Sequence, residues 1–194
     1  MAHKLALMGA GGKMGVRSAT NLLQSDFDVA HVEISEAGRA RLKEAIGVDC
    51  VPVEEALKGA DVVLLAGHLP KRDDVTYFVT HPCHPPIYND EQTDAGRKDY
   101  FGGIAAQQGI VNALMQGPEE HYALGEKVGR AIYAPVARSH RVTVEQMALL
   151  EPGLSETVCA SLLDVMREAM DEVVRRGVPK EAARDFLLGH MNIL

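Results

Sequence analysis

Short apolar segments alternate with amphipathic segments over roughly the first eighty residues. Strands are expected at 4–8, 29–34, 49–51 and 61–66, with helices between them at 13–24, 35–45 and 53–58. Parallel strands need crossover connections, which are usually helices, so this order predicts a parallel sheet. A further apolar run at 75–80 predicts one more strand.

The rest of the chain has the periodicity of helices. We expect helices at 100–115 and 118–132, a long helix from Thr143 to Gly177, and a last helix from Pro179 towards Leu194. The fold class predicted is therefore α/β, with a Rossmann-type parallel sheet domain at 1–96 and an all-α C-terminal domain at 97–194.

The long helix carries one apolar stripe with a helical repeat. Its members are Met147, Leu150, Leu154, Val158, Leu162, Val165, Ala169 and Val173. Pro152 lies inside the stripe and predicts a kink, because its ring displaces the carbonyl four residues earlier. A small domain cannot cover so long a stripe, so we expect a homodimer through the C-terminal helices.

A glycine-rich turn follows the first strand and opens the first helix. The residues of this candidate dinucleotide site are Gly9, Gly11, Gly12, Lys13, Met14 and Gly15, together with Glu33 at the end of the second strand. Glycines let backbone amides approach a pyrophosphate, and the helix N-terminus adds partial positive charge. A carboxylate at Glu33 accepts from ribose hydroxyls and repels a 2′-phosphate, which favours NAD. The alternative is a glycine turn with no ligand.

Two histidines lie in a proline-rich turn, 81–86, directly after an apolar strand. His81 and His84 could ligate a divalent metal, or one could be a general base; alternatively they cap neighbouring backbone. Glu151 lies beside the apolar stripe, where a carboxylate is costly unless it binds a metal, a cation or a hydroxyl, although it could instead face solvent. The basic segment 138–141 could bind a substrate carboxylate or be an ordinary loop.

Composition excludes several classes of protein. The chain has 194 residues, 46% hydrophobic, and a net charge of −7 without a basic cluster, which argues against nucleic-acid binding. No apolar run approaches the roughly 18 residues of a membrane span, and the N-terminus is unlike a signal peptide. Three cysteines at unrelated spacings predict free thiols and a cytoplasmic location.

Long motifs carry a more specific resemblance, and they span nearly the whole chain. They are GAGGKMG, VTYFVTHPCHPPIYND, FGGIAAQQGIVNALMQGPEEHYALGE, SHRVTVEQMALLEP and GVPKEAARDFLLGHMNI. Together with Glu33 they resemble the D-apionate oxidoisomerases, within the 6-phosphogluconate dehydrogenase-like group.

The resemblance implies NAD-dependent conversion of D-apionate, a sugar acid, to 3-oxo-isoapionate by alcohol oxidation and an α-ketol-type rearrangement. It implies that the glycine turn and Glu33 hold NAD, and that His81 and Glu151 hold a divalent metal ion, zinc or similar. His84 is then the candidate base or support for the metal ligands, so that the catalytic set is His84, His81 and Glu151.

The chain also departs from this family. Relatives carry a further helix and strand after Ala66 and a helical tail after Leu194, so we expect that the sequence joins segments of a longer chain. Two other functions stay open. One is an NAD-dependent β-hydroxyacid or sugar-acid dehydrogenase without rearrangement, and the other is a non-catalytic NAD(H)-binding module.

Overall fold

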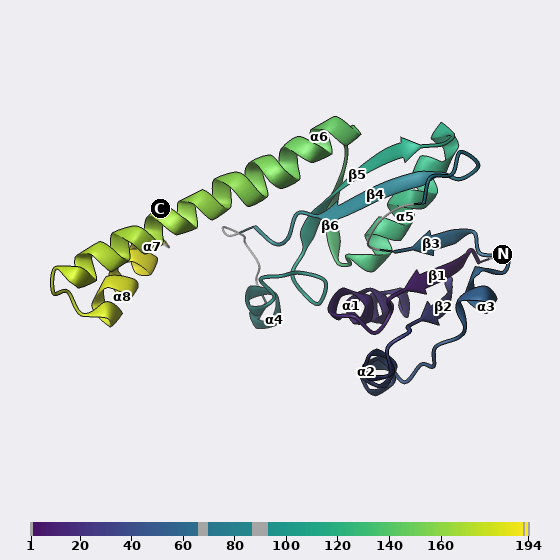
Figure 1. Cartoon of the computed structure of the whole chain (residues 1–194), viewed down its shortest axis with the longest axis horizontal. Coiled ribbons are helices and arrows are strands. Elements are labelled where there is room, and N and C mark those ends of the chain that lie inside the picture. The colour runs from purple at the N-terminus through teal and green to yellow at the C-terminus, as the bar shows by residue number, and fades with distance from the viewer. Residues whose placement is uncertain (1, 66–69, 87–92, 192, 194) are drawn as a thin grey trace. The chain divides into compact units, whose positions relative to one another are not determined.

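The computed structural model describes residues 2–65, 70–86, 93–191 and 193 (Figure 1). The chain divides into two compact units, Met1–Thr143 and Val144–Leu194. The predicted domain boundary between residues 96 and 97 falls inside the first of them. The predicted junction after Ala66 lies outside the described residues.

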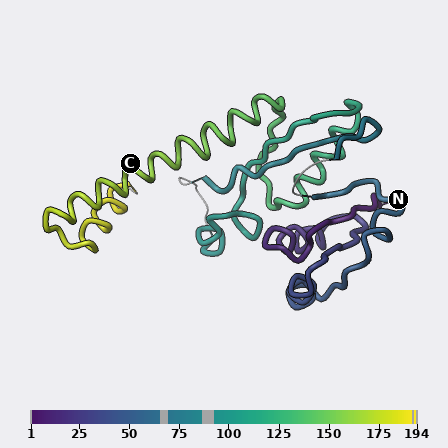
Figure 2. Tube along the Cα trace, in the orientation of Figure 1, coloured from purple at the N-terminus to yellow at the C-terminus, as the bar shows by residue number. Residues whose placement is uncertain are grey.

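The first unit begins with a parallel sheet of the order β2-β1-β3. Its strands are β1 (Lys4–Met8), β2 (Asp28–Val32) and β3 (Val62–Leu64), and its helices are α1 (Lys13–Leu22), α2 (Glu36–Ile46) and α3 (Val53–Leu57). The trace in Figure 2 runs from β1 through a tight turn into α1. This arrangement confirms the predicted Rossmann-like fold. The strand predicted at 49–51 is wrong, because this segment contributes only an isolated Val51 amide bond to the His31 carbonyl.

A second sheet of the order β4-β5-β6 belongs to the same unit. Its strands are β4 (Tyr77–Pro82), β5 (Gln108–Gln116) and β6 (Val136–Arg141), and the short helix α4 (Asp94–Lys98) precedes β5. β4 and β5 are antiparallel, whereas β5 and β6 are parallel. The strand predicted at 75–80 is confirmed by β4, shifted by two residues.

The helix predicted at 100–115 is wrong, and the region after residue 96 is not wholly helical, because β5 and β6 lie in it. The side chains of β5 are buried on both faces: Ile110, Asn112 and Ala113 are all fully buried. Such a strand has a continuous apolar run instead of alternation, so periodicity does not separate it from a buried helix. β6 has mostly polar residues and carries no apolar signal at all.

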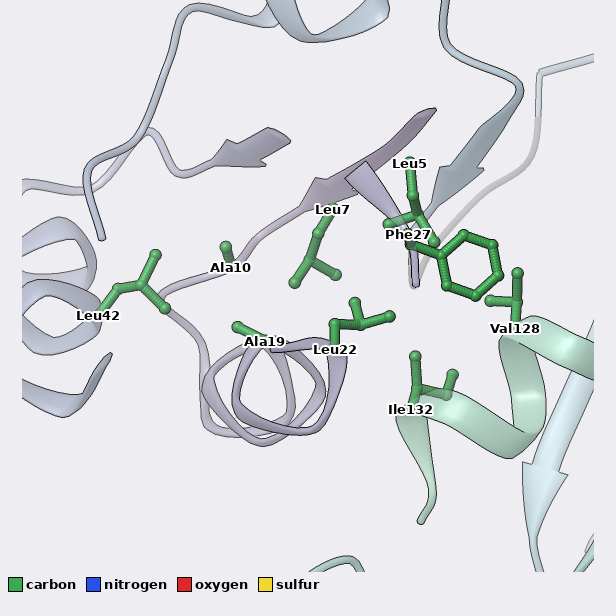
Figure 3. Close-up of a cluster of buried hydrophobic side chains, with 9 residues drawn as sticks. All are labelled: Leu5, Leu7, Ala10, Ala19, Leu22, Phe27, Leu42, Val128 and Ile132. Carbon is green, nitrogen blue, oxygen red and sulfur yellow. The ribbon is translucent and has the colours of Figure 1, made fainter. Parts of the chain in front are cut away.

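Helix α5 (Tyr122–Ile132), which follows the short 3₁₀ turn Glu119–His121, packs on the second sheet and on α1. Val128 and Ile132 enter the main core cluster with Leu5, Leu22 and Phe27 (Figure 3). Its glycines face β4, since a Cβ on Gly125 would lie 2.5 Å from the Phe78 ring, and one on Gly129 would lie 2.6 Å from the Thr80 hydroxyl. The helix predicted at 118–132 is thereby confirmed.

The second unit is helical, as predicted for this part of the chain. Its elements are α6 (Val144–Ala148), a π-helical segment η2 (Leu149–Cys159), α7 (Ala160–Arg175) and α8 (Lys180–Met191). Pro152 lies within η2, so the expected disturbance takes the form of widened turns. Within the described ranges, no helix is both long and apolar enough to span a bilayer.

The apolar stripe of the long helix is not buried within the chain, contrary to the sequence pattern. Leu154, Leu162 and Val165 are exposed, and only Met147 is buried. Helical periodicity identifies a face that requires a partner, but it does not say whether that partner belongs to the same chain.

The end of α1 offers a matched test of the core. Leu22 is 2% exposed, whereas the next residue, Leu23, is 50% exposed. We expect Leu22→Ala to lower the free energy of unfolding by about 2–5 kcal/mol, because it leaves a cavity between α1 and α5. Leu23→Ala should lower it by less than about 1 kcal/mol. Urea unfolding of both variants measures the difference, and equal losses would contradict this packing.

Candidate functional site

The turn between β1 and α1 has a backbone that only glycines can form. Gly9 is left-handed, with φ +72°, and its carbonyl accepts the Gly12 amide at 3.0 Å. A Cβ on Gly15 would lie 2.1 Å from the same carbonyl oxygen. No side chain caps α1, and its first turn holds no acidic residue. The positive helix terminus is therefore suited to an anion such as a pyrophosphate.

Glu33 joins this turn to the start of α2. Its Oε2 accepts the Gly11 amide at 3.0 Å, and its Oε1 accepts the Ser35 amide at 2.8 Å. Gly11 and Gly38 meet backbone to backbone, because a Cβ on Gly11 would lie 2.3 Å from the Gly38 oxygen. Arg41 Nη1 also donates to the Gly11 carbonyl at 2.6 Å. Each carboxylate oxygen of Glu33 keeps a second acceptor site for a hydroxyl, so the donor and acceptor set fits the adenosine ribose of NAD.

All the residues predicted for the dinucleotide lie around this one turn. They are Gly9, Gly11, Gly12, Lys13, Met14, Gly15 and Glu33. Their role in binding stays a prediction, which the geometry of the turn supports.

The histidine turn begins where β4 ends. His81 lies opposite Val111 in the β4–β5 register, and its ring is 6.2 Å from the ring of His84, between centroids. His84 has a left-handed backbone, φ 59°, and its Nδ1 lies 2.7 Å from the Phe101 carbonyl oxygen. A carbonyl only accepts, so Nδ1 carries the proton of this bond and Nε2 of the neutral ring has the lone pair. His84 is thus oriented as a base or a metal ligand.

Asp99 shapes the loop that presents Phe101 to His84. Its carboxylate is 4% exposed and accepts backbone amides at distances of 2.8–3.1 Å. The donors are Gly102, Ile104, Ala105 and Ala106. Burial raises the pKa of Asp99, but the four amide hydrogen bonds together outweigh burial, so the pKa lies below its ordinary value of 3.8. Sequence reasoning missed this loop, although an aspartate shortly before Gly102-Gly103 is a turn signal.

A small open hollow lies between α1 and the end of β4, where the histidine turn begins. Met14 and Arg17 of α1 line it together with Pro82, Phe101 and Gln108. The hollow thus connects the helix of the glycine turn with the residue that follows His81. Arg17 and Gln108 were not among the predicted site residues, because nothing in their sequence surroundings separates them from an ordinary helix surface and an ordinary strand.

The predicted metal pair is divided between the two units. His81 belongs to the first unit, and Glu151 lies half-buried in η2 of the second. In the part of the chain that the structure describes, no group of three or more His, Cys, Asp or Glu side chains is arranged to hold a metal ion. The metal role of His81 and Glu151 stays a prediction.

Two protein families match the chain. The family described as "Phosphogluconate dehydrogenase (decarboxylating) C-term" matches residues 89–194. The family described as "NADP oxidoreductase coenzyme F420-dependent" matches residues 4–81, which include the glycine turn and Glu33.

Two curated relatives are similar over almost the entire chain. The D-apionate oxidoisomerase of Rhizobium rhizogenes is 61% identical over 223 aligned positions, which cover 98% of this chain and 81% of the relative. The D-apionate oxidoisomerase of Cupriavidus necator is 60% identical, covering 100% and 82%. The 223 aligned positions exceed the 194 residues of this chain, so the relative has additional residues inside the matched region.

A solved structure shares the fold at high similarity. It is described as a semialdehyde dehydrogenase NAD-binding protein from Cupriavidus necator in complex with calcium and NAD. It superposes with a TM-score of 0.95 at 59% identity, covering 100% of this chain and 82% of that one.

The Asp99 loop yields a pH-dependent prediction. Asp99→Asn should lower the free energy of unfolding at pH 7 by about 2 kcal/mol, because it removes the charge that the four amides surround. The lowered pKa of Asp99 means that its stabilisation is complete above the ordinary value of 3.8 and is lost as the pH falls through the lower, folded value.

The difference in the free energy of unfolding between wild type and Asp99→Asn should therefore be largest at neutral pH. In urea unfolding series it should become smaller below about pH 4. Asp28→Asn, at an exposed aspartate on β2, is the control and should leave stability unchanged. A gap that stays constant down to strongly acidic pH would contradict the role given to Asp99.

Proposed function

The chain belongs to the D-apionate oxidoisomerase family, and we propose from this membership that it converts D-apionate to 3-oxo-isoapionate with NAD. It is an NAD-binding oxidoreductase with a small-molecule substrate. The observation that carries the proposal is the course of α1, which starts at the glycine turn and lines the hollow beside the histidine turn. One helix thus connects a dinucleotide site to a candidate base.

The cofactor site is proposed at the glycine turn. The backbone amides of residues 13–15, at the N-terminus of α1, would hold the pyrophosphate, and Glu33 would accept from the ribose. A carboxylate held by two backbone amides leaves no place for a 2′-phosphate, which favours NAD over NADP. When bound, NAD supplies the hydride acceptor for the alcohol oxidation.

His84 is proposed to move the protons of the reaction. Its Nε2 would take the hydroxyl proton of the secondary alcohol next to the carboxylate as that carbon is oxidised. In the rearrangement, a hydroxymethyl group leaves the neighbouring tertiary carbinol and bonds to the new carbonyl carbon. The tertiary hydroxyl loses its proton and becomes a carbonyl, while the former carbonyl oxygen gains a proton. The rearrangement is thus an isomerisation with no further oxidant.

His81 and Glu151 are proposed to hold a divalent metal ion, zinc or similar. An imidazole and a carboxylate are suitable donors for such an ion, and substrate oxygens could complete its coordination. When bound, the metal would supply a Lewis acid that polarises the carbonyl oxygen during migration. His81 would remain next to His84, with the ring centroids 6.2 Å apart.

The first test is NADH formation from D-apionate and NAD, with and without EDTA. Wild type should form NADH and 3-oxo-isoapionate, and EDTA should abolish turnover until a divalent metal is restored. His84→Ala should lower kcat by about 10²- to 10⁴-fold, because the base is lost. His3→Ala, at an exposed histidine near the N-terminus, should leave kcat unchanged.

Each other outcome rejects a defined part of the proposal. Turnover that resists EDTA rejects the metal. NADH formation with a product that keeps the apionate skeleton replaces the oxidoisomerase by a sugar-acid dehydrogenase without rearrangement. Binding of NADH without turnover favours a non-catalytic module.

We also propose that the enzyme is a cytoplasmic homodimer. Its three cysteines, Cys50, Cys83 and Cys159, are free thiols, as expected in a reducing compartment. The exposed stripe of α7 includes Leu162, Val165 and Val173, with Phe186 and Leu188 exposed on α8. Soluble proteins seldom expose so many large apolar side chains on neighbouring helices, and a second copy would cover them.

Sedimentation velocity at micromolar concentration tests the dimer. Wild type should sediment as a dimer, and Leu162→Glu should shift it to a monomer, because a carboxylate would be buried in the interface. Ser161→Glu places the same charge next to the stripe on α7 and should remain dimeric. A monomeric wild type would refute the proposal.

A further inference from the structure

Arg17 lies between the glycine turn and the histidine turn and was not assigned to either of them. It lies on α1 just beyond Gly15, and its guanidinium covers the Phe101 ring at 4.6 Å from the centroid. The His84 ring contacts the same phenyl ring, with a centroid separation of 4.7 Å. The cation and the candidate base therefore contact the same aromatic ring.

The hydrogen-bond donors of Arg17 remain available. Its nearest carboxylate is Asp99, at 3.9 Å, which is longer than a hydrogen bond, and the Asp99 oxygens already accept four backbone amides. Among the described residues, no acceptor takes a hydrogen bond from the Arg17 guanidinium. Phe101 thus fixes the plane of the guanidinium while its N–H groups stay open to a ligand in the hollow.

Gln108 is a buried polar residue at the edge of the same hollow. The residue is 2% exposed and lines the same hollow. Its Nε2 donates to the Tyr133 carbonyl at 2.9 Å, which fixes the orientation of the amide. Its Oε1 is buried and has no hydrogen-bond partner within the described ranges. A buried acceptor without a donor is unfavourable, so the packing around Gln108 carries an energetic cost beside the hollow.

One arginine of the basic segment that was predicted to bind a substrate carboxylate is already engaged. Arg141, in the basic segment 138–141, forms a two-pronged ion pair with Glu119 and covers the Tyr122 ring at 4.3 Å. Its fork is therefore occupied within the protein. Arg17 has a comparable aromatic support, whereas its ion pair with Asp99 is 3.9 Å long and includes no hydrogen bond.

We propose that Arg17 is the carboxylate anchor of a sugar-acid subsite at this hollow. The inference rests on the proposed function, which supplies the sugar acid. A planar guanidinium binds a carboxylate through two parallel hydrogen bonds, and the carboxylate of D-apionate is next to the carbon to be oxidised. Arg17 would thereby orient that carbon towards His84.

The test compares D-apionate with its neutral amide, D-apionamide, as substrates of wild type, Arg17→Met, Arg17→Lys and Arg72→Met. Arg17→Met should raise KM for D-apionate by about 10- to 100-fold and abolish the preference for the acid over the amide. Arg17→Lys keeps the charge without the fork and should have an intermediate effect. Arg72→Met removes an exposed arginine paired with Asp74 and should change neither constant.

NADH affinity, measured by fluorescence titration, should be the same in all four proteins, because the glycine turn is untouched. If Arg17 had a purely structural role, its replacement would raise KM for the acid and for the amide alike. An unchanged ratio between these two KM values would overturn the inference. A wild type without turnover overturns the proposed function instead. Calorimetric binding of D-apionate and D-apionamide with NADH present then measures the same ratio, and absence of binding overturns the subsite.

Discussion

The contact between α1 and α5 is the interaction on which both parts of the candidate site depend. Leu22 of α1 shares a core with Val128 and Ile132 of α5, and Asn21 Nδ2 donates to the carbonyls of Ile132 and Ala134. α1 carries the glycine turn at its start, while α5 packs through its glycines on β4, the strand that leads to the histidine turn. The distance between cofactor site and histidines is therefore set by one helix pair inside the first unit.

The sequence predicted the features that depend on local rules. The β1–turn–α1 unit follows from glycines at positions where a Cβ would collide with backbone, as at Gly15, and from an apolar strand before them. Glu33 was predicted from its place after β2, and it does reach the Gly11 amide. The histidine turn was predicted from His81 and His84 after an apolar strand, and the structure adds what fixes the His84 ring.

The remainder depends on contacts between distant segments. β5 is buried on both faces, so its apolar run was interpreted as a helix, and that error hid the Asp99 loop in front of it. The four amides that surround Asp99 belong to residues without a shared motif, so only the folded backbone brings them to one carboxylate. The stripe on α7 was recognised correctly as apolar, but periodicity could not say which surface covers Leu162.

The two arginines show why residue type did not identify the polar part of the site. Arg141 lies in a segment that resembles an anion site, yet its guanidinium already binds the Glu119 carboxylate. It therefore has no pair of N–H groups left to bind a ligand carboxylate in the same way. Arg17 lies on an ordinary helix, yet Phe101 supports it, and within the described part of the chain its N–H groups make no hydrogen bond, since Asp99 at 3.9 Å already accepts four amides. An arginine can bind a ligand when neighbouring acceptors within the protein do not already occupy its N–H groups. Because those neighbours are placed by the α1–α5 contact and the Asp99 loop, the same packing that forms the core also keeps one cation available beside the histidine turn.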